Sequence, residues 1–203
     1  MSCNTRIAGT VALGAALLIA VGLSTSPAQA AFVVTLTQEG PNVVAIGSGT
    51  INTTGLSFYY SQNTGVHPFV EPQFADIVTG QFPSAIDVYE SAYAGPTSFG
   101  SGYETGASSG SGSIVGIYNH DIVVVPYDYR SGSPLMDTAT YDNATFSSLG
   151  VTPGTYVWSW GSGLNADSFT LTVGAAAVSE PSTLDLMTLG LLGAGFARRK
   201  RPN

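Results

Sequence analysis

The chain has 203 residues, of which 44% are apolar, 10% are aromatic and only 9% carry a charge. Its formal net charge of −7 argues against a nucleic-acid-binding function, because an acidic chain repels phosphate. The aromatic content argues against a disordered acidic chain, and the length fits one domain with a hydrophobic core.

Charge is distributed unevenly along the chain. Five of the six basic residues lie at its two ends, and Arg130 is the only one between residues 31 and 179. The same segment contains eleven acids, which give it a formal charge of −10. The opposite charges of the middle and the C-terminal end indicate a chain built of three parts.

Residues 1–30 have the pattern of an export signal. Arg6 precedes an apolar run at 11–21, and a polar stretch with a proline follows. Ala28 and Ala30 supply the small side chains that signal peptidase requires at positions −3 and −1. The apolar run is too short to span a membrane comfortably. We therefore predict cleavage after Ala30 rather than a permanent anchor.

The segment 31–174 is predicted to be an all-β domain, specifically an antiparallel, Greek-key-like β-sandwich. No window in it has the apolar spacing of an amphipathic helix, whereas short β-rich runs bounded by turn residues recur. The predicted strands are 32–37, 43–51, 74–78, 86–90, 114–118, 122–125, 140–146, 154–160 and 167–173. The run 122–125 is expected to be buried on both faces, and Gly47 and Gly49 predict a bulge or close packing.

The last two predicted strands form the best-defined hairpin. In the second of them, Phe169, Leu171 and Val173 point to one face, which is the pattern of a half-buried strand. The sequence Val151-Thr-Pro-Gly-Thr-Tyr156 has the form of a tyrosine corner, in which the hydroxyl bonds to upstream backbone. These features favour a sandwich.

A glycine- and serine-rich stretch at 95–113 has two interpretations. It could link two small domains, but each would then hold too few residues to be stable without disulfides. The only cysteine, Cys3, lies in the leader, so the mature domain has none. We therefore expect a long surface loop within one domain.

The domain contains weak candidates for catalysis. Gly106-Ala-Ser-Ser-Gly110 matches the G-x-S-x-G motif, but a nucleophile elbow needs a strand before it and a helix after it. His67 and His120, the only histidines, have no patterned partner, and zinc needs three or four ligands. We predict that the domain is not an enzyme and requires no metal or cofactor.

Two binding interpretations stay open. Asp121 and Asp128, or Asp137 with Asp142 and Asn143, could supply oxygen ligands for calcium from loops, although no D-x-D-x-D-G loop is present. A solvated acidic surface explains them more simply.

Aromatic and threonine side chains could instead contact a polymer. Tyr156, Trp158 and Trp160 fall on one strand face and could stack on sugar rings, but we expect them to fill the core. The short T-x-T rows at 35–37 and 170–172 could meet ice or polysaccharide, or be ordinary exposed strand threonines.

The C-terminal part combines three signals. A linker, 175–182, ends in Glu180, Pro181 and Ser182, and Thr183 begins a short apolar stretch rich in leucine and glycine. The segment 183–203 is predicted to be a short transmembrane helix with a basic tail. The tail contains Arg198, Arg199, Lys200 and Arg201, which the positive-inside rule places in the cytoplasm as a stop signal.

This order resembles the PEP-CTERM sorting signal of exopolysaccharide-producing Gram-negative bacteria. The matching residues are Glu180, Pro181, Ser182 and Thr183, the leucine- and glycine-rich helix, and the basic cluster 198–201. Ser179 replaces the first proline of the Pro-Glu-Pro motif. Tails of this type are also catalogued as the C-terminal domain of ice-binding proteins, although the tail has no ice-binding chemistry. The stretch 141–173 also resembles ectodomains attached to such tails.

The resemblance implies processing by an exosortase, a membrane enzyme similar to transpeptidases. We therefore predict an exported, non-catalytic protein of the cell surface or extracellular matrix. Signal peptidase and the exosortase are its expected processing partners, and exopolysaccharide is a possible further one. The chain would be held transiently in the inner membrane with its domain in the periplasm. The alternative is a secreted carbohydrate- or calcium-binding module anchored by the same tail.

Overall fold

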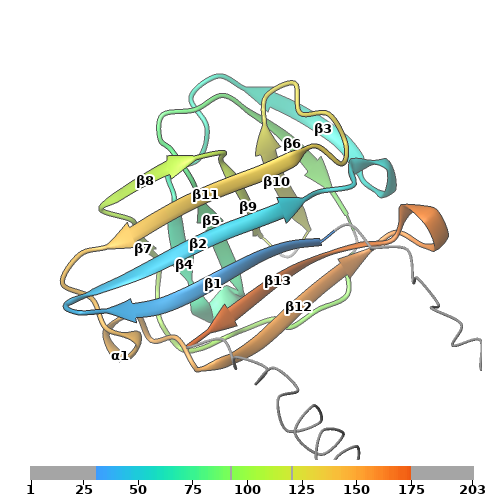
Figure 1. Cartoon of the computed structure of the whole chain (residues 1–203). Coiled ribbons are helices and arrows are strands. Elements are labelled where there is room, and N and C mark those ends of the chain that lie inside the picture. Colours follow the sequence, from blue (N-terminus) through green and yellow to red (C-terminus); the bar gives the residue numbers. More distant parts are fainter. Residues whose placement is uncertain (1–30, 92, 120, 175–203) are drawn as a thin grey trace, which may run out of the picture.

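The computed structural model describes residues 31–91, 93–119 and 121–174, which form two β-sheets with almost no helix (Figure 1). The prediction of an all-β fold is confirmed. The first strands are β1 (Ala31–Glu39), β2 (Asn42–Thr50), β3 (Ser57–Gln62), β4 (Phe69–Glu71), β5 (Asp76–Thr79), β6 (Ile86–Glu90) and β7 (Thr105–Gly106). The later strands are β8 (Ser109–Gly112), β9 (Val115–Tyr118), β10 (Ile122–Pro126), β11 (Pro134–Tyr141), β12 (Gly154–Trp160) and β13 (Asp167–Val173).

The six-stranded sheet has the order β12-β13-β1-β2-β11-β8. The predicted hairpin of β12 and β13 is present, with Trp158 opposite Phe169. The prediction of an antiparallel fold is wrong at one pair, because β1 and β13 run parallel, with Val34 opposite Leu171. These are the first and last strands of the domain, so the whole chain between them serves as the crossover that parallel strands need.

The seven-stranded sheet has the order β3-β6-β10-β9-β5-β4-β7. Strands β9 and β10 form the hairpin that the sequence predicts, with Tyr118 opposite Ile122. His120, expected in the turn of this hairpin, lies outside the described residues.

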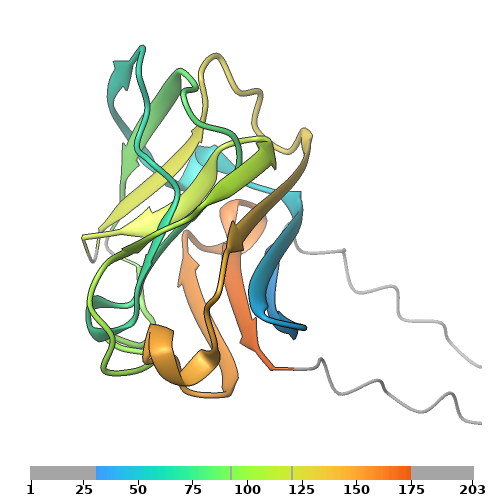
Figure 2. The ribbon, with the colours of Figure 1, turned by 90° about the vertical axis from the view of Figure 1, so that its left-hand side faces the viewer.

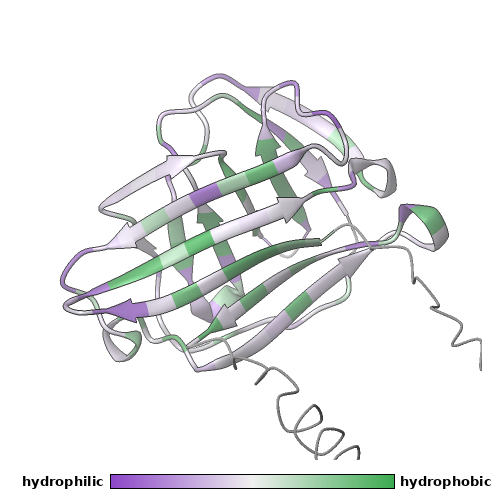
Figure 3. Ribbon diagram, in the orientation of Figure 1, coloured by the Kyte–Doolittle hydropathy of each residue, from purple (hydrophilic) through white to green (hydrophobic). Residues whose placement is uncertain are grey.

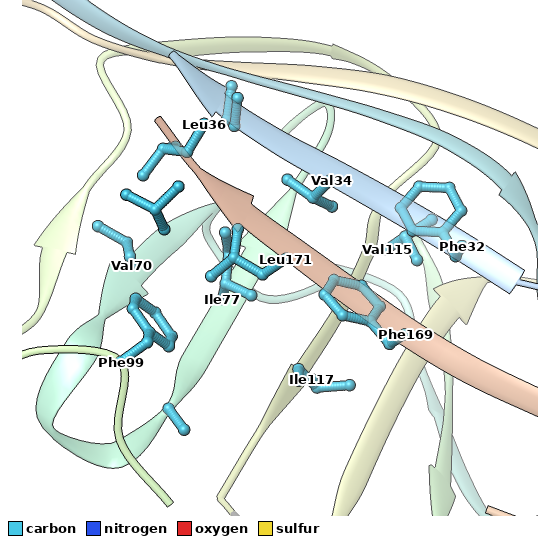
Figure 4. Packing of buried hydrophobic residues seen from close by; sticks show 14 of the residues in the cluster. Phe32, Val34, Leu36, Val70, Ile77, Phe99, Val115, Ile117, Phe169 and Leu171 are labelled. Atoms are coloured by element: carbon cyan, nitrogen blue, oxygen red, sulfur yellow. The ribbon is translucent and has the colours of Figure 1, made fainter. Parts of the chain in front are cut away.

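The two sheets face each other (Figure 2). A shared hydrophobic core lies between them. Phe32 and Phe169 of one sheet contribute to it together with Ile77 and Ile117 of the other (Figure 4). Alternation along each strand explains this packing, since every second residue of β1 and β13 is buried.

The seven-stranded sheet is buried on both faces at its centre. Val123 and Val125 of β10 belong to the core between the sheets, whereas Ile122 and Val124 join a second cluster on the opposite face. Val66 and Tyr118 pack against that second cluster. The predicted burial of both faces of 122–125 is confirmed.

The stretch 140–146, predicted as one strand, contains only the end of a strand and the first residue of a helix. Strand β11 lies earlier, at Pro134–Tyr141, and a one-turn helix, α1 (Phe146–Leu149), follows. Thr145 and Ser148 form a reciprocal capping box that starts this helix. Similarly, the predicted strand at 74–78 begins as the 3₁₀ turn Pro72–Phe74 and becomes extended only in β5.

The glycine- and serine-rich stretch 95–113 joins the two sheets. It contains β7, which pairs with β4 in the seven-stranded sheet, and β8, which pairs with β11 in the six-stranded sheet. The indole Nε1 of Trp158 donates a hydrogen bond to the carbonyl of Pro96 at 2.9 Å. The stretch is therefore not simply a surface loop, because it contributes a strand to each sheet.

The tyrosine corner is present. The hydroxyl of Tyr156 donates a hydrogen bond to the carbonyl oxygen of Thr152 at 2.9 Å, and the ring packs against Phe99 at 5.7 Å between centroids. We expect Tyr156→Phe to lower the free energy of unfolding by about 1 kcal/mol, since only the hydrogen bond is lost. Urea unfolding measures this change, and an equal loss in Thr155→Val, which leaves the corner intact, would argue against it.

Gly47 marks close packing rather than a bulge, because the register of β1 and β2 is continuous through it. A methyl group there would lie 2.3 Å from Oδ1 of Asp137 and 2.7 Å from Cζ of Phe32. We expect Gly47→Ala to destabilise the domain by about 1–3 kcal/mol through overpacking. Gly106→Ala is the matched control, because the added methyl would lie 3.3 Å or more from its neighbours. Equal melting temperatures for the two variants would contradict the expectation.

Candidate functional site

The residues predicted to direct processing lie outside the described part of the chain. They are the cleavage residues Ala28 and Ala30, the motif Glu180, Pro181, Ser182 and Thr183, and the basic residues Arg198, Arg199, Lys200 and Arg201. Within 31–91, 93–119 and 121–174, no helix has the length and apolar character needed to cross a membrane. The roles of the cleavage residues, the motif and the basic residues stay predictions, as do the domain boundaries.

Ser108 and His67 line one small cavity of about 90 Å³, together with Phe82. The amide N–H of Asp142 donates to the Ser108 hydroxyl at 3.0 Å, and Nδ1 of His67 lies 2.8 Å from the carbonyl of Pro68. No helix follows the G-x-S-x-G motif, which runs from β7 into β8. The cavity has room for about three waters and is far below the about 300 Å³ of a substrate pocket.

The structure separates the residues considered for calcium. Asp137 points into the core with 1% of its surface exposed, whereas Asp142 and Asn143 are exposed beyond the end of β11. Among the described residues, no three acidic, histidine or cysteine side chains converge to hold a metal ion. Asp121 instead lines a separate open pocket.

That pocket has a volume of about 520 Å³ and a polar lining. It is lined by Gly55, Ser57, Glu90, Ser91, Asp121 and Gly161, so its side chains are hydroxyls and carboxylates. Ser57 begins β3, the outermost strand of the seven-stranded sheet, and is followed there by the exposed aromatics Phe58, Tyr59 and Tyr60. Hydroxyl and carboxylate groups suit polar ligands such as sugars.

Two buried aspartates hold turns: the hairpin turn between β9 and β10, and the turn that follows β10. Asp76 accepts a hydrogen bond from the amide N–H of Asn119 at 2.9 Å, and Asp87 accepts one from that of Asp128 at 3.0 Å. Both Asn119 and Asp128 have a φ of 57°, a left-handed conformation that few residues adopt freely. These carboxylates therefore stabilise turns, a role that the sequence does not reveal because acids normally indicate surface.

Asp167 is also fully buried, and it joins β13 to the segment after β2. Its carboxylate accepts hydrogen bonds from the amide N–H groups of Asn52 and Ser168. Burial raises the pKa of Asp167 to about 6, and the two hydrogen bonds limit the rise.

Asp137 is also buried, but its carboxylate lacks hydrogen bonds of this kind. Among the described residues, neither carboxylate oxygen has a hydrogen-bond partner of normal geometry. Burial raises its pKa to about 7, although the nearby Thr79 side chain and Gly47 backbone oppose the rise. The ionised form of this carboxyl group therefore destabilises the folded domain.

The aromatic residues of β12 fill the core rather than forming a sugar-stacking row. Trp158 and Trp160 are buried, and Trp158 packs edge-on against Phe169 at 6.0 Å between centroids. Tyr156 is half-buried in the tyrosine corner. The expectation that these side chains belong to the core is confirmed.

The two T-x-T rows come together on one surface, the side of the six-stranded sheet that faces away from the core (Figure 3). Thr35 lies directly opposite Thr172, and the same row continues to Thr155 on one side and to Ile46 on the other. Strand neighbours lie about 4.8 Å apart.

We call this surface the outer face and define it by fifteen outward residues from the middle of five strands. They are Val33, Thr35 and Thr37 of β1, Val44, Ile46 and Ser48 of β2, Met136, Thr138 and Thr140 of β11, Thr155, Val157 and Ser159 of β12, and Ser168, Thr170 and Thr172 of β13. None of these fifteen residues carries a charge or an aromatic ring. Glu39, at the end of β1, points to the same side and accepts a hydrogen bond from the Thr37 hydroxyl at 3.2 Å.

Residues 177–201 match the sequence model of the PEP-CTERM protein-sorting motif. The matched segment contains Glu180, Pro181 and the basic cluster 198–201, so the resemblance of the tail is confirmed. No curated protein and no solved structure matches the chain.

Proposed function

We propose, from the PEP-CTERM protein-sorting motif that this chain carries at its C-terminal end, that it is a non-catalytic protein of the cell surface or extracellular matrix. The motif supports a C-terminal sorting signal, which an exosortase processes in exported proteins. It begins at residue 177, a few residues after β13 ends at Val173. That match is the observation that carries the proposal.

The proposed route uses the three parts of the chain in order. Signal peptidase removes 1–30, and the segment 183–203 holds the exported chain in the inner membrane, with the domain in the periplasm. The exosortase then acts near Glu180 and Pro181 and passes the domain to the surface. The opposite charges of the domain and of the basic tail support this topology.

A passive role of the domain is supported by how it uses its polar groups. Asp76, Asp87 and Asp167 bind backbone amides rather than facing a cavity. The cavity that Ser108 and His67 line has a volume of about 90 Å³. We therefore propose a Greek-key-like β-sandwich that is displayed rather than one that turns over a substrate.

The pocket beside β3 favours a second candidate function, a carbohydrate-binding module displayed by the same tail. Its volume of about 520 Å³ suits a small saccharide, and Glu90 and Asp121 could accept hydrogen bonds from sugar hydroxyls. Glycan arrays and calcium titration of the segment 31–174 distinguish the candidates. Binding that is lost in Glu90→Gln would favour the module.

The sorting proposal is tested by changing the motif. We expect the double variant Glu180→Ala, Pro181→Ala to accumulate in the inner membrane of the native host at full length. The matched control is Glu39→Ala, Pro41→Ala, which changes the same residue types at an exposed turn of the domain. Cell fractionation and intact mass report the outcome, and normal release of the motif variant would contradict the proposal.

A further inference from the structure

We propose that the edge of the seven-stranded sheet at β3 binds a glycan chain that carries no acidic groups. The contact surface, which we call the aromatic row, consists of Tyr59, Tyr60 and Tyr118 and lies beside the pocket that Glu90 and Asp121 line. Strand β3 is the outermost strand of this sheet (Figure 1). The inference is independent of sorting. It rests on the second candidate function, for which it names the site and the class of ligand.

The aromatic row lies on the face of the seven-stranded sheet that points away from the core. Tyr60 lies opposite Val88, and Tyr118 lies opposite Ile122. Val88 and Ile122 belong to the second hydrophobic cluster, which lies on that face. Since directly paired residues of neighbouring strands point to the same side, both tyrosines lie over this cluster.

Side-chain contacts link the members of the row. The ring of Tyr59 meets that of Tyr60 edge-on at 4.9 Å between centroids, and Tyr118 meets Phe69 in the same way at 6.4 Å. Burial raises the pKa of the Tyr118 hydroxyl, and the nearby Tyr60 side chain and the charge of Asp121 add to the rise. Tyr60 and Tyr118 therefore approach each other above β6 and β10, and the row crosses from β3 to β9 over about 14 Å.

A β-bulge leaves three consecutive aromatic side chains exposed on β3. The register with β6 shifts between Phe58 and Tyr60, so Tyr59 is the additional residue. Phe58, Tyr59 and Tyr60 expose 58%, 57% and 37% of their surface. Contiguous exposed apolar side chains commonly mark interaction sites, and a bulge disfavours pairing of an edge with another strand. A ligand that stacks on the rings therefore fits this edge better than a peptide strand does.

Polar groups for sugar hydroxyls lie next to the row. Glu90 follows Val88 by two residues on β6, so its carboxylate lies on the face of the aromatic row. Ser57, which lies opposite Glu90, and Asp121 line the same pocket of about 520 Å³. Aromatic rings beside hydroxyl and carboxylate acceptors match a pyranose, which has apolar faces and a rim of hydroxyl groups.

The charge of the domain selects among glycans. The segment 31–179 has a formal charge of −10, and its only basic residue, Arg130, lies between β10 and β11 and not in the pocket lining. A polymer of uronic acids would be repelled by this charge and by the two carboxylates of the pocket. Neutral sugars avoid the repulsion, and protonated amino sugars gain attraction to the carboxylates and to the tyrosine rings. The length of the row favours a chain over a single sugar.

Isothermal titration calorimetry of the full-length chain, in a detergent without a sugar headgroup, tests the inference. The probes are neutral oligomers of β- and α-linked glucose, a chitosan oligosaccharide and an oligogalacturonate. We expect a non-acidic oligomer to bind and the oligogalacturonate not to bind. Binding of the chitosan oligosaccharide should weaken with added salt, because salt screens the carboxylates. Glucose and glucosamine should bind at least about tenfold more weakly than the oligomer of the same sugar, since one ring cannot span the row.

Two pairs of variants locate the site. Tyr59→Ala should weaken binding at least about tenfold, because the ring on which the sugar stacks is lost. Its matched control is Tyr103→Ala, since Tyr103 is 76% exposed and lies just before β7, at the opposite edge of the same sheet. Glu90→Gln should also weaken binding, whereas its control Glu104→Gln, next to Tyr103, should not. We expect all four melting temperatures to stay unchanged, because these side chains are exposed.

Three results would overturn the inference. The first is no binding of any non-acidic oligomer, and the second is preferred binding of the oligogalacturonate. The third is an equal effect of Tyr59→Ala and Tyr103→Ala. Binding that Glu90→Gln removes and Tyr59→Ala leaves intact would retain the second candidate function but confine the ligand to the pocket, against the aromatic row. Sorting is measured separately by cell fraction and mass, so its failure is distinguishable from a failure of glycan binding.

Discussion

Replacing Asp137 by asparagine is expected to stabilise the domain at pH 8 by up to about 4 kcal/mol and to remove the contribution of this group to the pH dependence of stability. The carboxyl group is 1% exposed, and neither of its oxygens has a hydrogen-bond partner of normal geometry among the described residues. The pKa of Asp137 is about 7 in the folded protein, against an ordinary value of 3.8. A difference of about three pKa units corresponds to about 4 kcal/mol.

The sign of the effect follows from proton binding. Between about pH 4 and pH 7 the folded protein holds a proton on Asp137 that the unfolded chain has already released. The contribution of this group to the free energy of unfolding is therefore greatest at low pH and falls as the pH rises through 7. Asparagine stays neutral at every pH and is nearly the same size.

Urea unfolding of the segment 31–174 from pH 4 to pH 8 measures the effect. Asp167→Asn is the matched control, because Asp167 is equally buried but accepts two backbone hydrogen bonds. The pKa of Asp167 is raised less, to about 6, so we expect a smaller gain in stability at pH 8 in this control and a loss of only the pH dependence below about pH 6. An unchanged pH dependence in Asp137→Asn would show that Asp137 is ionised in the folded state without penalty.

Replacing the four basic residues 198–201 by serine is the other change with a large expected effect. Moving an arginine or lysine to the centre of a bilayer costs about 3 kcal/mol, so four of them oppose passage of the tail by about 12 kcal/mol. Without them, we expect the tail to leave the membrane and the processed form to fall at least about tenfold.

A charge-preserving control separates topology from recognition. In it, Arg198, Arg199 and Arg201 are replaced by lysine, so that the cluster keeps its charge but loses its guanidinium groups. Normal processing of this variant would indicate that the positive charge of the cluster is what holds the tail in the membrane. Loss of processing in both variants, with the chain still in the membrane, would instead indicate direct recognition of arginine.

Local patterns in the sequence predict much of the fold. Alternation predicts β1 and β13, the continuous apolar run predicts that β10 is buried on both faces, and the motif before β12 predicts the tyrosine corner. Each of these signals is contained in a few consecutive residues.

The features that the sequence does not reveal have physical reasons. Strand β11 has an acid, Asp137, at an inward position, which interrupts its apolar alternation. Strand β3 is an exposed edge with three consecutive aromatics, so it has no alternation at all. The parallel pairing of β1 with β13 joins the two ends of the domain, which no local pattern encodes.

The candidate sites also differ in whether a local sequence pattern reveals them. The sorting motif is a linear signal within about 25 residues, and sequence reasoning finds it. The outer face combines rows from five strands, and the T-x-T repeats on β1 and β13 are its only local trace. The turn-binding role of Asp76 and Asp87 depends on partners about 40 residues away.

The most direct test of the sorting proposal is the intact mass and cell fraction of the natural chain in its host, with and without the exosortase. With the enzyme, we predict a surface or extracellular form that starts at Ala31 and lacks the segment beyond the sorting motif. Without it, the chain should keep residues up to Asn203 and stay in the inner membrane. Identical masses and locations in the two strains would contradict exosortase sorting.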